Sequence, residues 1–341
     1  MIRIAVLGVG RIGRMHAENI AAHPRATLAG VYDVIDAAAA DVSARLSVPA
    51  FGSVEEVLAS PEVDAILIAT STPTHADLIE KAVAAGKPML CEKPIDLSLA
   101  RVDACARRIA GTAVPIMLGF VRRFDPSHRA VRDAVRAGRI GDLHQVVITS
   151  RDPGLAPEGY LKVSGGIFRD MTIHDFDMAR FVLGEEVVAV QATGSRLVDP
   201  AMMERLGDYD TVSITLTTAS GKQAVITNSR QSVYGYDQRV EALGTLGMAQ
   251  SENIRAHHMV LSTQAQTGEG APLQNFFIDR YREAFAAEIG AFVDAVETGT
   301  APEVGFEDGR QALVLAEAAL RSAQVGRTVQ VSEAARQSEP A

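Results

Sequence analysis

The first thirteen residues constrain the fold more than any other part of the chain. An apolar run at 2–7 leads directly into Gly8-Val9-Gly10-Arg11-Ile12-Gly13, and an amphipathic segment begins at about residue 11. A G-x-G-x-x-G spacing is weak evidence alone, but a strand before it and a helix after it are the context in which it binds a dinucleotide. Gly8 permits a tight turn, Gly10 lets the backbone approach a pyrophosphate, and Gly13 lets the helix pack on the strand. An ordinary glycine turn is disfavoured in this context.

Asp33 stands at the end of the second predicted strand, 20 residues after Gly13. An acidic side chain there accepts hydrogen bonds from the adenosine ribose hydroxyls and repels a 2′-phosphate. Val34 and Ile35 follow and supply no cation that would hold such a phosphate. We therefore expect NAD rather than NADP. The predicted cofactor site contains Gly8, Gly10, Arg11, Ile12, Gly13 and Asp33.

Short apolar runs alternate with amphipathic segments up to about residue 120. The predicted strands are 2–7, 27–33, 65–69, 88–91 and 114–118, and the predicted helices are 11–22, 36–46, 54–59, 74–85 and 98–110. The strands are apolar on both faces, which is typical of a parallel sheet covered by helices on each side. Residues 1–120 are thus expected to form an α/β Rossmann domain with a doubly wound parallel sheet.

After residue 120 the pattern changes to that of an α+β domain. We expect helices at 127–137 and 169–183, strands at 143–150, 186–193, 211–218, 223–229, 239–243 and 259–263, and helices at 278–298 and 307–323. Alternating polar and apolar residues in consecutive strands predict a largely antiparallel open sheet, whose outer face is solvated or paired with a partner. This second domain is placed at 121–332, and 333–341 are expected to be a polar, frayed tail.

Composition and cysteine usage exclude several classes of protein. The formal charge of −9 leaves no basic face for nucleic acid. Only Cys91 and Cys105 are present, without metal-ligand spacing, so we expect neither a disulfide framework nor a metal site. There is no signal-peptide pattern, and no apolar stretch approaches the roughly 18–20 residues that span a bilayer. We therefore expect a cytoplasmic protein with no membrane or nucleic-acid partner.

A second polar loop, Thr70-Ser71-Thr72, follows the predicted strand at 65–69. Ligands bind beyond the carboxyl ends of parallel strands, and small hydroxylated residues there suit a nucleotide. Thr72 fits equally well as an N-cap before Pro73. His75 follows in the first turn of a helix, where a structural role is favoured over a catalytic one. Its position places it with these three residues among the candidates for the cofactor site.

Glu92-Lys93-Pro94 ends the predicted strand at 88–91, at the same edge of the sheet. Lysine is rarely buried without a partner, so Lys93 is a candidate for polarising a substrate oxygen. Pro94 restrains the backbone directly after it. The alternative is a surface salt bridge between Glu92 and Lys93. Both residues are also candidates for the cofactor site.

Asp170 and His174 are four residues apart in a predicted helix and therefore share one face. A carboxylate beside an imidazole orients the ring and stabilises its protonated form, as a general base requires. An ion pair on the helix surface fits this spacing equally well. Oxidation of an alcohol by NAD needs a base and a group that stabilises the alkoxide. His174, Asp170 and Lys93 are the catalytic candidates that meet this need.

These motifs together resemble the glucose–fructose oxidoreductase / inositol dehydrogenase / rhizopine-catabolism (Gfo/Idh/MocA) family. The resemblance rests on the glycine motif at 8–13, the Ala69-Thr70 loop, Glu92-Lys93-Pro94 and the Asp170-x-x-x-His174 pair, and it extends along nearly the entire chain. Within the family, 164–180, Asn228-Ser229-Arg230 and 234–239 resemble the inositol 2-dehydrogenases most. The substrate loops at 151–163 and 196–208 are not among the segments on which this resemblance rests.

The resemblance implies oxidation of myo-inositol at its axial C2 hydroxyl to 2-keto-myo-inositol, with release of NADH. It also implies a catalytic group of Lys93, Asp170 and His174, and a homotetramer formed through the second domain's open sheet. Positions that line the polyol pocket in such enzymes correspond to Arg122, Asp152 and Tyr234, with Tyr236 as the alternative to Tyr234. A cyclitol carries hydroxyls all round, so a pocket rich in acidic, basic and aromatic hydroxyl groups is expected on chemical grounds.

Other functions stay open at this stage. The same scaffold serves a dehydrogenase of scyllo- or chiro-inositol, or of an aldose such as glucose. A non-catalytic sensor that binds NAD and a sugar would not need Lys93, Asp170 and His174 together. A glycosidase that recycles its NAD would not release the cofactor.

Overall fold

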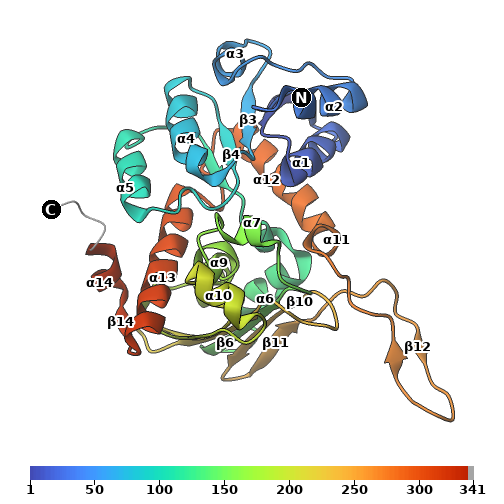
Figure 1. The fold of residues 1–341 in the computed structure, drawn as a ribbon, viewed down its shortest axis with the longest axis vertical. Coiled ribbons are helices and arrows are strands. Elements are labelled where there is room, and N and C mark those ends of the chain that lie inside the picture. The colour runs from blue at the N-terminus through green and yellow to red at the C-terminus, as the bar shows by residue number, and fades with distance from the viewer. Residues whose placement is uncertain (337–341) are drawn as a thin grey trace. The chain divides into compact units, whose positions relative to one another are not determined.

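The computed structural model describes residues 1–336, which form two compact units (Figure 1). Among the described residues, the first contains Met1–Phe124 and Glu283–Leu313, and the second contains Asp125–Arg282 and 314–336. A single boundary near residue 120 therefore does not describe 283–313, which we expected in the second domain. The physical reason is burial, because α12 (Arg282–Thr298) packs its apolar side chains into the first unit, and an apolar periodicity does not reveal which core will accept it.

The first unit contains a five-stranded parallel sheet in the order β2-β1-β3-β4-β5. Its strands are β1 (Ile2–Leu7), β2 (Ala26–Tyr32), β3 (Ala65–Ile68), β4 (Met89–Cys91) and β5 (Ile116–Leu118). Its helices are α1 (Arg11–Ala22), α2 (Asp36–Leu46), α3 (Val54–Ala59), α4 (His75–Ala84), α5 (Leu99–Arg108) and α12, with the first part of α13 (Phe306–Val325). The predicted strands and helices of 1–120 are confirmed to within two residues at each end.

Two features of this sheet place a ligand at one edge. Every residue of β3 is fully buried, as a parallel strand covered on both faces requires. The chain runs outward from β1 to β2 and then returns to β3 on the other side of β1. Ligands of open α/β sheets bind beyond the carboxyl ends of the strands at such a reversal. The loops after β1, β3 and β4 are therefore the relevant ones.

The second unit contains a seven-stranded sheet in the order β11-β10-β6-β9-β8-β7-β14. The strands are β6 (Leu143–Arg151), β7 (Val187–Ser195), β8 (Thr211–Thr218), β9 (Gln223–Ser229), β10 (Asp237–Gly244), β11 (Gly247–Ser251) and β14 (Val329–Gln330). Only β6 and β9 run parallel, so the predicted largely antiparallel sheet is confirmed. The short strands β11 and β14 were not predicted.

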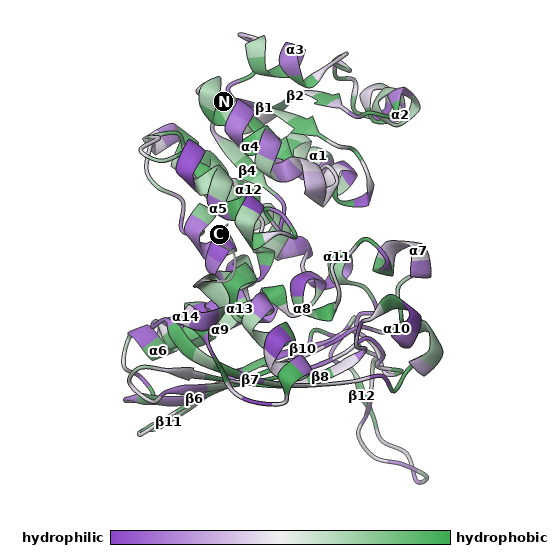
Figure 2. Cartoon of the chain, turned by 60° about the vertical axis from the view of Figure 1, so that its left-hand side comes forward, coloured by the Kyte–Doolittle hydropathy of each residue, from purple (hydrophilic) through white to green (hydrophobic). Residues whose placement is uncertain are grey.

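One face of this sheet is apolar and covered. Along β8, Val212, Ile214 and Leu216 are buried, whereas the residues between them are at least partly exposed. The helices α6 (Pro126–Arg136) and α9 (Ile173–Leu183) pack on the covered face. Figure 2 shows the helices of the second unit on one side of the sheet and none of its described helices on the other.

Four expectations about the second domain are corrected. The strand at 259–263 is only β12 (Val260–Leu261), which pairs with β13 (Glu269–Gly270) in a protruding ribbon outside the sheet, because its apolar residues are exposed (Figure 1). The helix at 278–298 is divided into α11 (Phe277–Arg280) and α12, and that at 169–183 into α8 (Ile167–Asp170) and α9. The first part of the expected frayed tail, 333–336, belongs to the helix α14 (Val331–Arg336), where Glu333 pairs with Arg321 and Arg327. The rest of that tail, 337–341, lies outside the described residues.

Short helices complete the second unit. These are α7 (Glu158–Leu161) and α10 (Pro200–Leu206), neither of which was predicted. Within 1–336, no helix combines the length and the apolar character needed to cross a membrane.

Candidate active site

The glycine loop after β1 shows why each of its glycines is needed. A Cβ on Gly8 would lie 2.6 Å from the Ala69 carbonyl oxygen, and one on Gly13 would lie 1.9 Å from the Gly8 carbonyl oxygen. Internal packing therefore excludes side chains at both positions. A Cβ on Gly10 would meet nothing within 4 Å. Because the protein itself leaves this space open, the close approach that Gly10 allows is to a group from outside the chain.

The first turn of α1 fits the pyrophosphate of a dinucleotide. The helix begins at Arg11, its N-cap is Gly10 without a side-chain cap, and its first turn holds no acidic residue. Its initial N–H groups are thus available to an anion at the positive end of the helix dipole. The open space over Gly10 lies at the same point of the chain. The residues present therefore fit NAD.

Asp33 lies directly beside the glycine loop. One carboxylate oxygen accepts a hydrogen bond from the Val9 backbone N–H at 2.7 Å, and the other accepts from the Ile35 N–H at 2.9 Å. Each oxygen keeps a lone pair for a ribose hydroxyl. Val34 and Ile35 are 82% and 63% exposed and carry no charge. Asp33 is thus held against the backbone of the glycine loop, and its role toward the ribose stays a prediction.

The loop after β3 is held by the buried His75. One ring nitrogen of His75 lies 3.0 Å from the Thr70 carbonyl oxygen and the other lies 2.8 Å from the Pro94 carbonyl oxygen. His75 thus ties the Thr70 loop to the loop that carries Lys93. The short helix η1 (Thr72–Thr74) begins at Thr72 itself, and α4 begins after Thr74. The interpretation of Thr72 as the N-cap is therefore wrong.

Glu92 does not form the surface salt bridge with Lys93 that we considered. One of its carboxylate oxygens lies 2.8 Å from Nε2 of His16, and the other accepts from the backbone N–H of Lys93 at 3.3 Å. The side chain of Glu92 is only 15% exposed. Glu92 therefore pairs with a buried histidine of α1. Arg122, a predicted pocket residue, is buried in η2 (Val121–Phe124) after β5.

Asp170 and His174 do not share one helix. Asp170 is the last residue of α8, and His174 lies in the first turn of α9. The His174 N–H bonds to the Met171 carbonyl oxygen, so the i to i−4 ladder is interrupted between the two residues. The apolar spacing continues through this break, which is why the sequence predicted one helix. Met171 and Thr172 nevertheless keep right-handed helical backbone angles, so the chain passes through the break without leaving the helical conformation.

Asp170 is bound by two side chains that sequence analysis did not single out. Tyr160 donates its hydroxyl to one carboxylate oxygen at 2.6 Å, and Arg230 donates to the other at 3.1 Å. Desolvation of the Tyr160 hydroxyl and the neighbouring negative charge of Asp170 raise the pKa of Tyr160 well above its usual value. Tyr160 therefore stays a donor at any working pH. Charge-assisted bonds of this kind hold the Asp170 carboxylate in one orientation.

Arg230 is itself buried between two carboxylates. Its guanidinium contacts Asp170 on one side and Asp208 at 3.5 Å on the other. Asp208 also accepts from the Ile167 N–H at 2.9 Å, at the start of α8. Gly166, with φ +83°, precedes this turn, and a Cβ there would lie 2.9 Å from the Asp208 carboxylate. The second glycine of the Gly165-Gly166 loop is thus required by the approach of Asp208.

The start of α9 is anchored to the sheet by a buried network. Asp175, next to His174, accepts from Ser150 of β6 at 2.6 Å and from the Asn228 amide of β9 at 2.8 Å. The Thr172 hydroxyl donates to the side-chain amide oxygen (Oδ1) of Asn228 at 2.6 Å. Every bond lies in the interior, so the helix that carries His174 is fixed on both strands.

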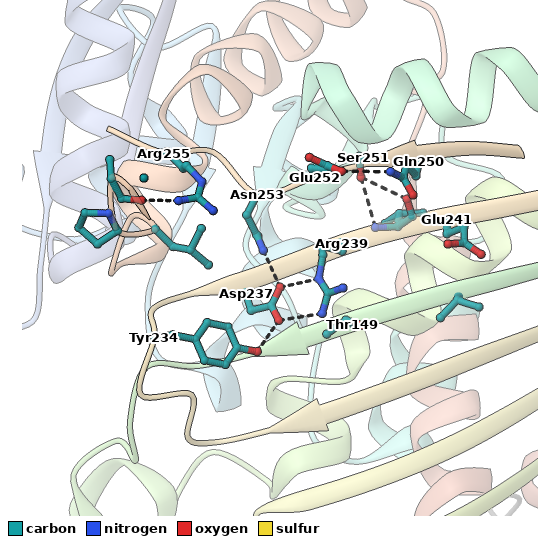
Figure 3. Close-up of a pocket in the computed structure, with 16 residues that line it drawn as sticks. Thr149, Tyr234, Asp237, Arg239, Glu241, Gln250, Ser251, Glu252, Asn253 and Arg255 are labelled. Carbon is teal, nitrogen blue, oxygen red and sulfur yellow. Dashed lines mark hydrogen bonds and ion pairs between the residues drawn. The ribbon is translucent and has the colours of Figure 1, made fainter. Parts of the chain in front are cut away.

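Asp152 and Tyr234 lie at different places in the second unit. Asp152 follows β6, and its N–H bonds to the carbonyl oxygen of Ser229, next to Arg230. Tyr234 accepts from Arg151 and donates to Asp237, beside a hollow of about 550 Å³ on the outer side of the sheet (Figure 3). The hydroxyl of Tyr234 is therefore engaged away from Asp170. The alternative, Tyr236, is buried with its ring edge against Tyr281.

A sequence signal for the missed residues exists in β9. Its buried residues alternate as Ala224, Ile226 and Asn228, so an amide occupies an inward position. A buried amide needs partners, and this predicts polar residues opposite it. Arg230 follows two residues later and continues the same inward side. Tyr160 gives no such signal, because it lies in α7, a helix of a single turn that is too short to show a periodicity.

Comparison with known proteins identifies the family. Residues 2–120 match an oxidoreductase family with an NAD-binding Rossmann fold, and residues 128–250 match the GFO/IDH/MocA C-terminal domain. The inositol 2-dehydrogenase of Rhizobium meliloti (strain 1021) is 48% identical over 97% of this chain and 99% of that protein. The chain belongs to the Gfo/Idh/MocA oxidoreductase family.

Further relatives cover the whole family fold. The myo-inositol 2-dehydrogenase of Thermotoga maritima is 43% identical over 97% of this chain and 99% of that protein. The crystal structure of a myo-inositol dehydrogenase from Corynebacterium glutamicum has a TM-score of 0.94 and 44% identity, and covers 100% of both chains. The predicted family, its two-domain fold and its NAD cofactor are confirmed. Among residues 1–336, no cluster of histidine, cysteine and acidic side chains has the arrangement of a metal site.

The two glycines of the loop make a matched pair for testing the cofactor site. Gly13→Ala should destabilise the protein by about 2–3 kcal/mol, because its methyl group collides with backbone. Gly10→Ala should leave the melting temperature unchanged to within about 2 °C, yet weaken NAD binding at least about tenfold. Thermal melts and titration of NAD by protein fluorescence measure both effects. Equal NAD affinity in Gly10→Ala and the wild type would contradict the assignment.

The Tyr160–Asp170 contact yields a second prediction. Tyr160→Phe removes one donor from the Asp170 carboxylate without opening a cavity, so kcat should fall about tenfold while the KM for NAD changes less than about twofold. Steady-state kinetics monitored by NADH absorbance test this. Tyr209→Phe is the matched control, because the Tyr209 ring packs against Phe168 and Arg196. A Tyr160→Phe enzyme with wild-type kcat would show that this contact does not orient Asp170.

Proposed function

We propose that the protein oxidises myo-inositol at its axial C2 hydroxyl to 2-keto-myo-inositol (scyllo-inosose), with NAD as the hydride acceptor. Relatives that carry the names inositol 2-dehydrogenase and myo-inositol 2-dehydrogenase match the chain over nearly its full length, and this observation carries the proposal. The charged and phenolic side chains around Asp170 support it, because a cyclitol presents hydroxyl groups on every side. A location in the cytoplasm belongs to the same proposal.

The chemical roles follow from the side chains. His174 takes the proton of the substrate hydroxyl, because neutral imidazole is a base near neutral pH. Lys93 opposes the negative charge that develops on the oxygen. Asp170, held by Tyr160 and Arg230, orients the base or relays its proton. NAD, when bound, accepts the hydride. Arg122 and Asp152 are the further candidates for holding the remaining hydroxyls.

A panel of polyols tests the proposed substrate. With NAD, myo-inositol should give the highest kcat/KM, ahead of scyllo-inositol, chiro-inositol and glucose, when NADH is followed by its absorbance. A rate maximum on another cyclitol or on glucose would replace the substrate but keep the class of reaction. Absence of turnover with every polyol, despite NAD binding, would favour a sensor. Cleavage of glycosides without release of NADH would favour a glycosidase.

The control for this assay removes the proposed chemistry and keeps cofactor binding. Lys93→Met and His174→Ala should each lower kcat by about 10²–10⁴-fold, with NAD affinity within about threefold of the wild type. Near-wild-type turnover in both variants would refute the assigned roles even if myo-inositol is the substrate.

The outer face of the second unit's sheet is proposed to pair with further copies of the chain in a homotetramer. A row of small polar groups crosses it in register, from Thr149 through Thr227 and Ser213 to Thr193. Such a row gives a flat surface with hydroxyls that can bond across an interface. Thr227→Arg should shift the sedimentation coefficient to a smaller species, whereas Ala110→Arg in the exposed turn after α5 of the first unit should not. A wild-type monomer at micromolar concentration would overturn this part.

A further inference from the structure

A buried polar cluster of the first unit takes no part in the chemistry described so far. It consists of His16 on α1, Glu92 after β4 and Glu288 on α12, and the side chains of His16 and Glu288 are fully buried. Burying three ionisable side chains is costly unless they satisfy one another. The burial of these three ionisable side chains together therefore requires a physical explanation.

Glu92 links this cluster to Lys93. Its two carboxylate oxygens face different partners, Nε2 of His16 at 2.8 Å and the backbone N–H of Lys93 at 3.3 Å. The end of β5 closes over it, because a Cβ on Gly119 would lie only 3.0 Å from the carboxylate. Glu92 is thus held between the His16 ring, the Lys93 N–H and the backbone of Gly119.

The helix α12 covers the other side of His16. The Phe285 ring meets the His16 ring edge-on, with ring centres 5.5 Å apart. Glu288 follows Phe285 by three residues and so lies on the same helical face. Both carboxyl oxygens of Glu288 and Nδ1 of His16 are buried without a partner among the described protein atoms. No direct bond joins these three atoms, so an enclosed water is the partner that such a cluster requires.

The protonation states of these side chains determine which of them donates and which accepts each hydrogen bond. Burial and the charge of Glu92 raise the pKa of Glu288 well above its ordinary value, so Glu288 is a neutral acid that can donate. A carboxylate only accepts, so the His16 Nε2 that faces Glu92 carries a proton. In a neutral ring the opposite nitrogen, Nδ1, then accepts. The Cys91 thiol of β4 is a further titratable group close enough to Glu92 to feel its charge.

We propose that Glu288, His16 and Glu92 form a directed hydrogen-bond chain that fixes Glu92 beneath the Lys93 peptide and thereby positions Lys93 for the reaction. Glu288 donates toward Nδ1 of His16 through one enclosed water. His16 donates to Glu92, and Glu92 accepts the Lys93 N–H. The three are positioning residues, and the inference rests on the role proposed above for Lys93.

Paired substitutions separate this role from a merely structural one. His16→Leu and Glu288→Met remove donors and should lower kcat about 10- to 100-fold, with the KM for NAD within about twofold. His16→Gln and Glu288→Gln keep an amide donor and should restore kcat to at least about a third of the wild-type value. Glu283→Gln, on the exposed side of α12, is the matched control and should match the wild type. The amide variants keep the test informative if an apolar variant fails to fold.

A double-mutant cycle decides whether the chain acts through Lys93. In a Lys93→Met background, His16→Leu should lower the residual kcat less than about twofold, because the positioned group is gone. Wild-type kcat in His16→Leu and Glu288→Met, alongside a strong loss in Lys93→Met, would overturn the chain but keep the proposed function. Near-wild-type turnover in Lys93→Met would instead refute the role proposed for Lys93.

The neutral state of Glu288 can be tested separately through the pH dependence of the protein's stability. Because folding raises its pKa above the ordinary value of 4.5, the contribution of Glu288 is greatest below that pH and is lost as the pH rises. Glu288→Gln does not titrate. Its melting temperature relative to the wild type should therefore increase between pH 5 and pH 8, whereas that of Glu283→Gln should not. A constant difference over this range would show that Glu288 is not held as a neutral acid.

Discussion

The cofactor side of the protein depends on the contact between the first turn of α1 and the carbonyl group of Gly8. The two backbone segments approach so closely that a Cβ on Gly13 would lie 1.9 Å from that oxygen. This approach lets the helix start immediately after the glycine turn, with its first N–H groups directed outward. Asp33 closes the loop from the neighbouring strand through the Val9 N–H. From α1, His16 reaches Glu92 at the end of β4. One close backbone approach thus aligns the loop that binds NAD with the loop that carries Lys93.

The second unit uses buried charge where the first uses backbone contact. Arg230 lies between Asp170 and Asp208, and Asp175 accepts from β6 and β9 at once. A buried ion pair contributes little net stability, since desolvation offsets the attraction, but removal of one partner is costly. Such groups therefore tolerate a single arrangement. In this unit that arrangement fixes the carboxylate of Asp170 and the helix that carries His174.

The sequence predicted elements well where one local pattern decided them. The strands of the first unit were located to within two residues, because a parallel strand buried on both faces is a short apolar run between turn residues. It failed where the same pattern permits two outcomes. The apolar spacing from residue 167 to 183 runs through the break between α8 and α9, and the apolar residues of β12 resemble a sheet strand although they are exposed. Helix periodicity likewise did not reveal that α12 packs with the first unit.

By itself, the sequence determined the doubly wound sheet, the glycine loop with Asp33, the family and its cofactor, because each depends on residues close together in the chain or on motifs in a set order. Only the tertiary structure decided the partners of the chemical groups. Glu92 pairs with His16 from 76 residues away, and Asp170 pairs with Arg230 from 60 residues away. Such bonds depend on how strands and helices meet in space. A local pattern can mark a buried polar position, as it does for Asn228 in β9, but it does not identify the distant partner.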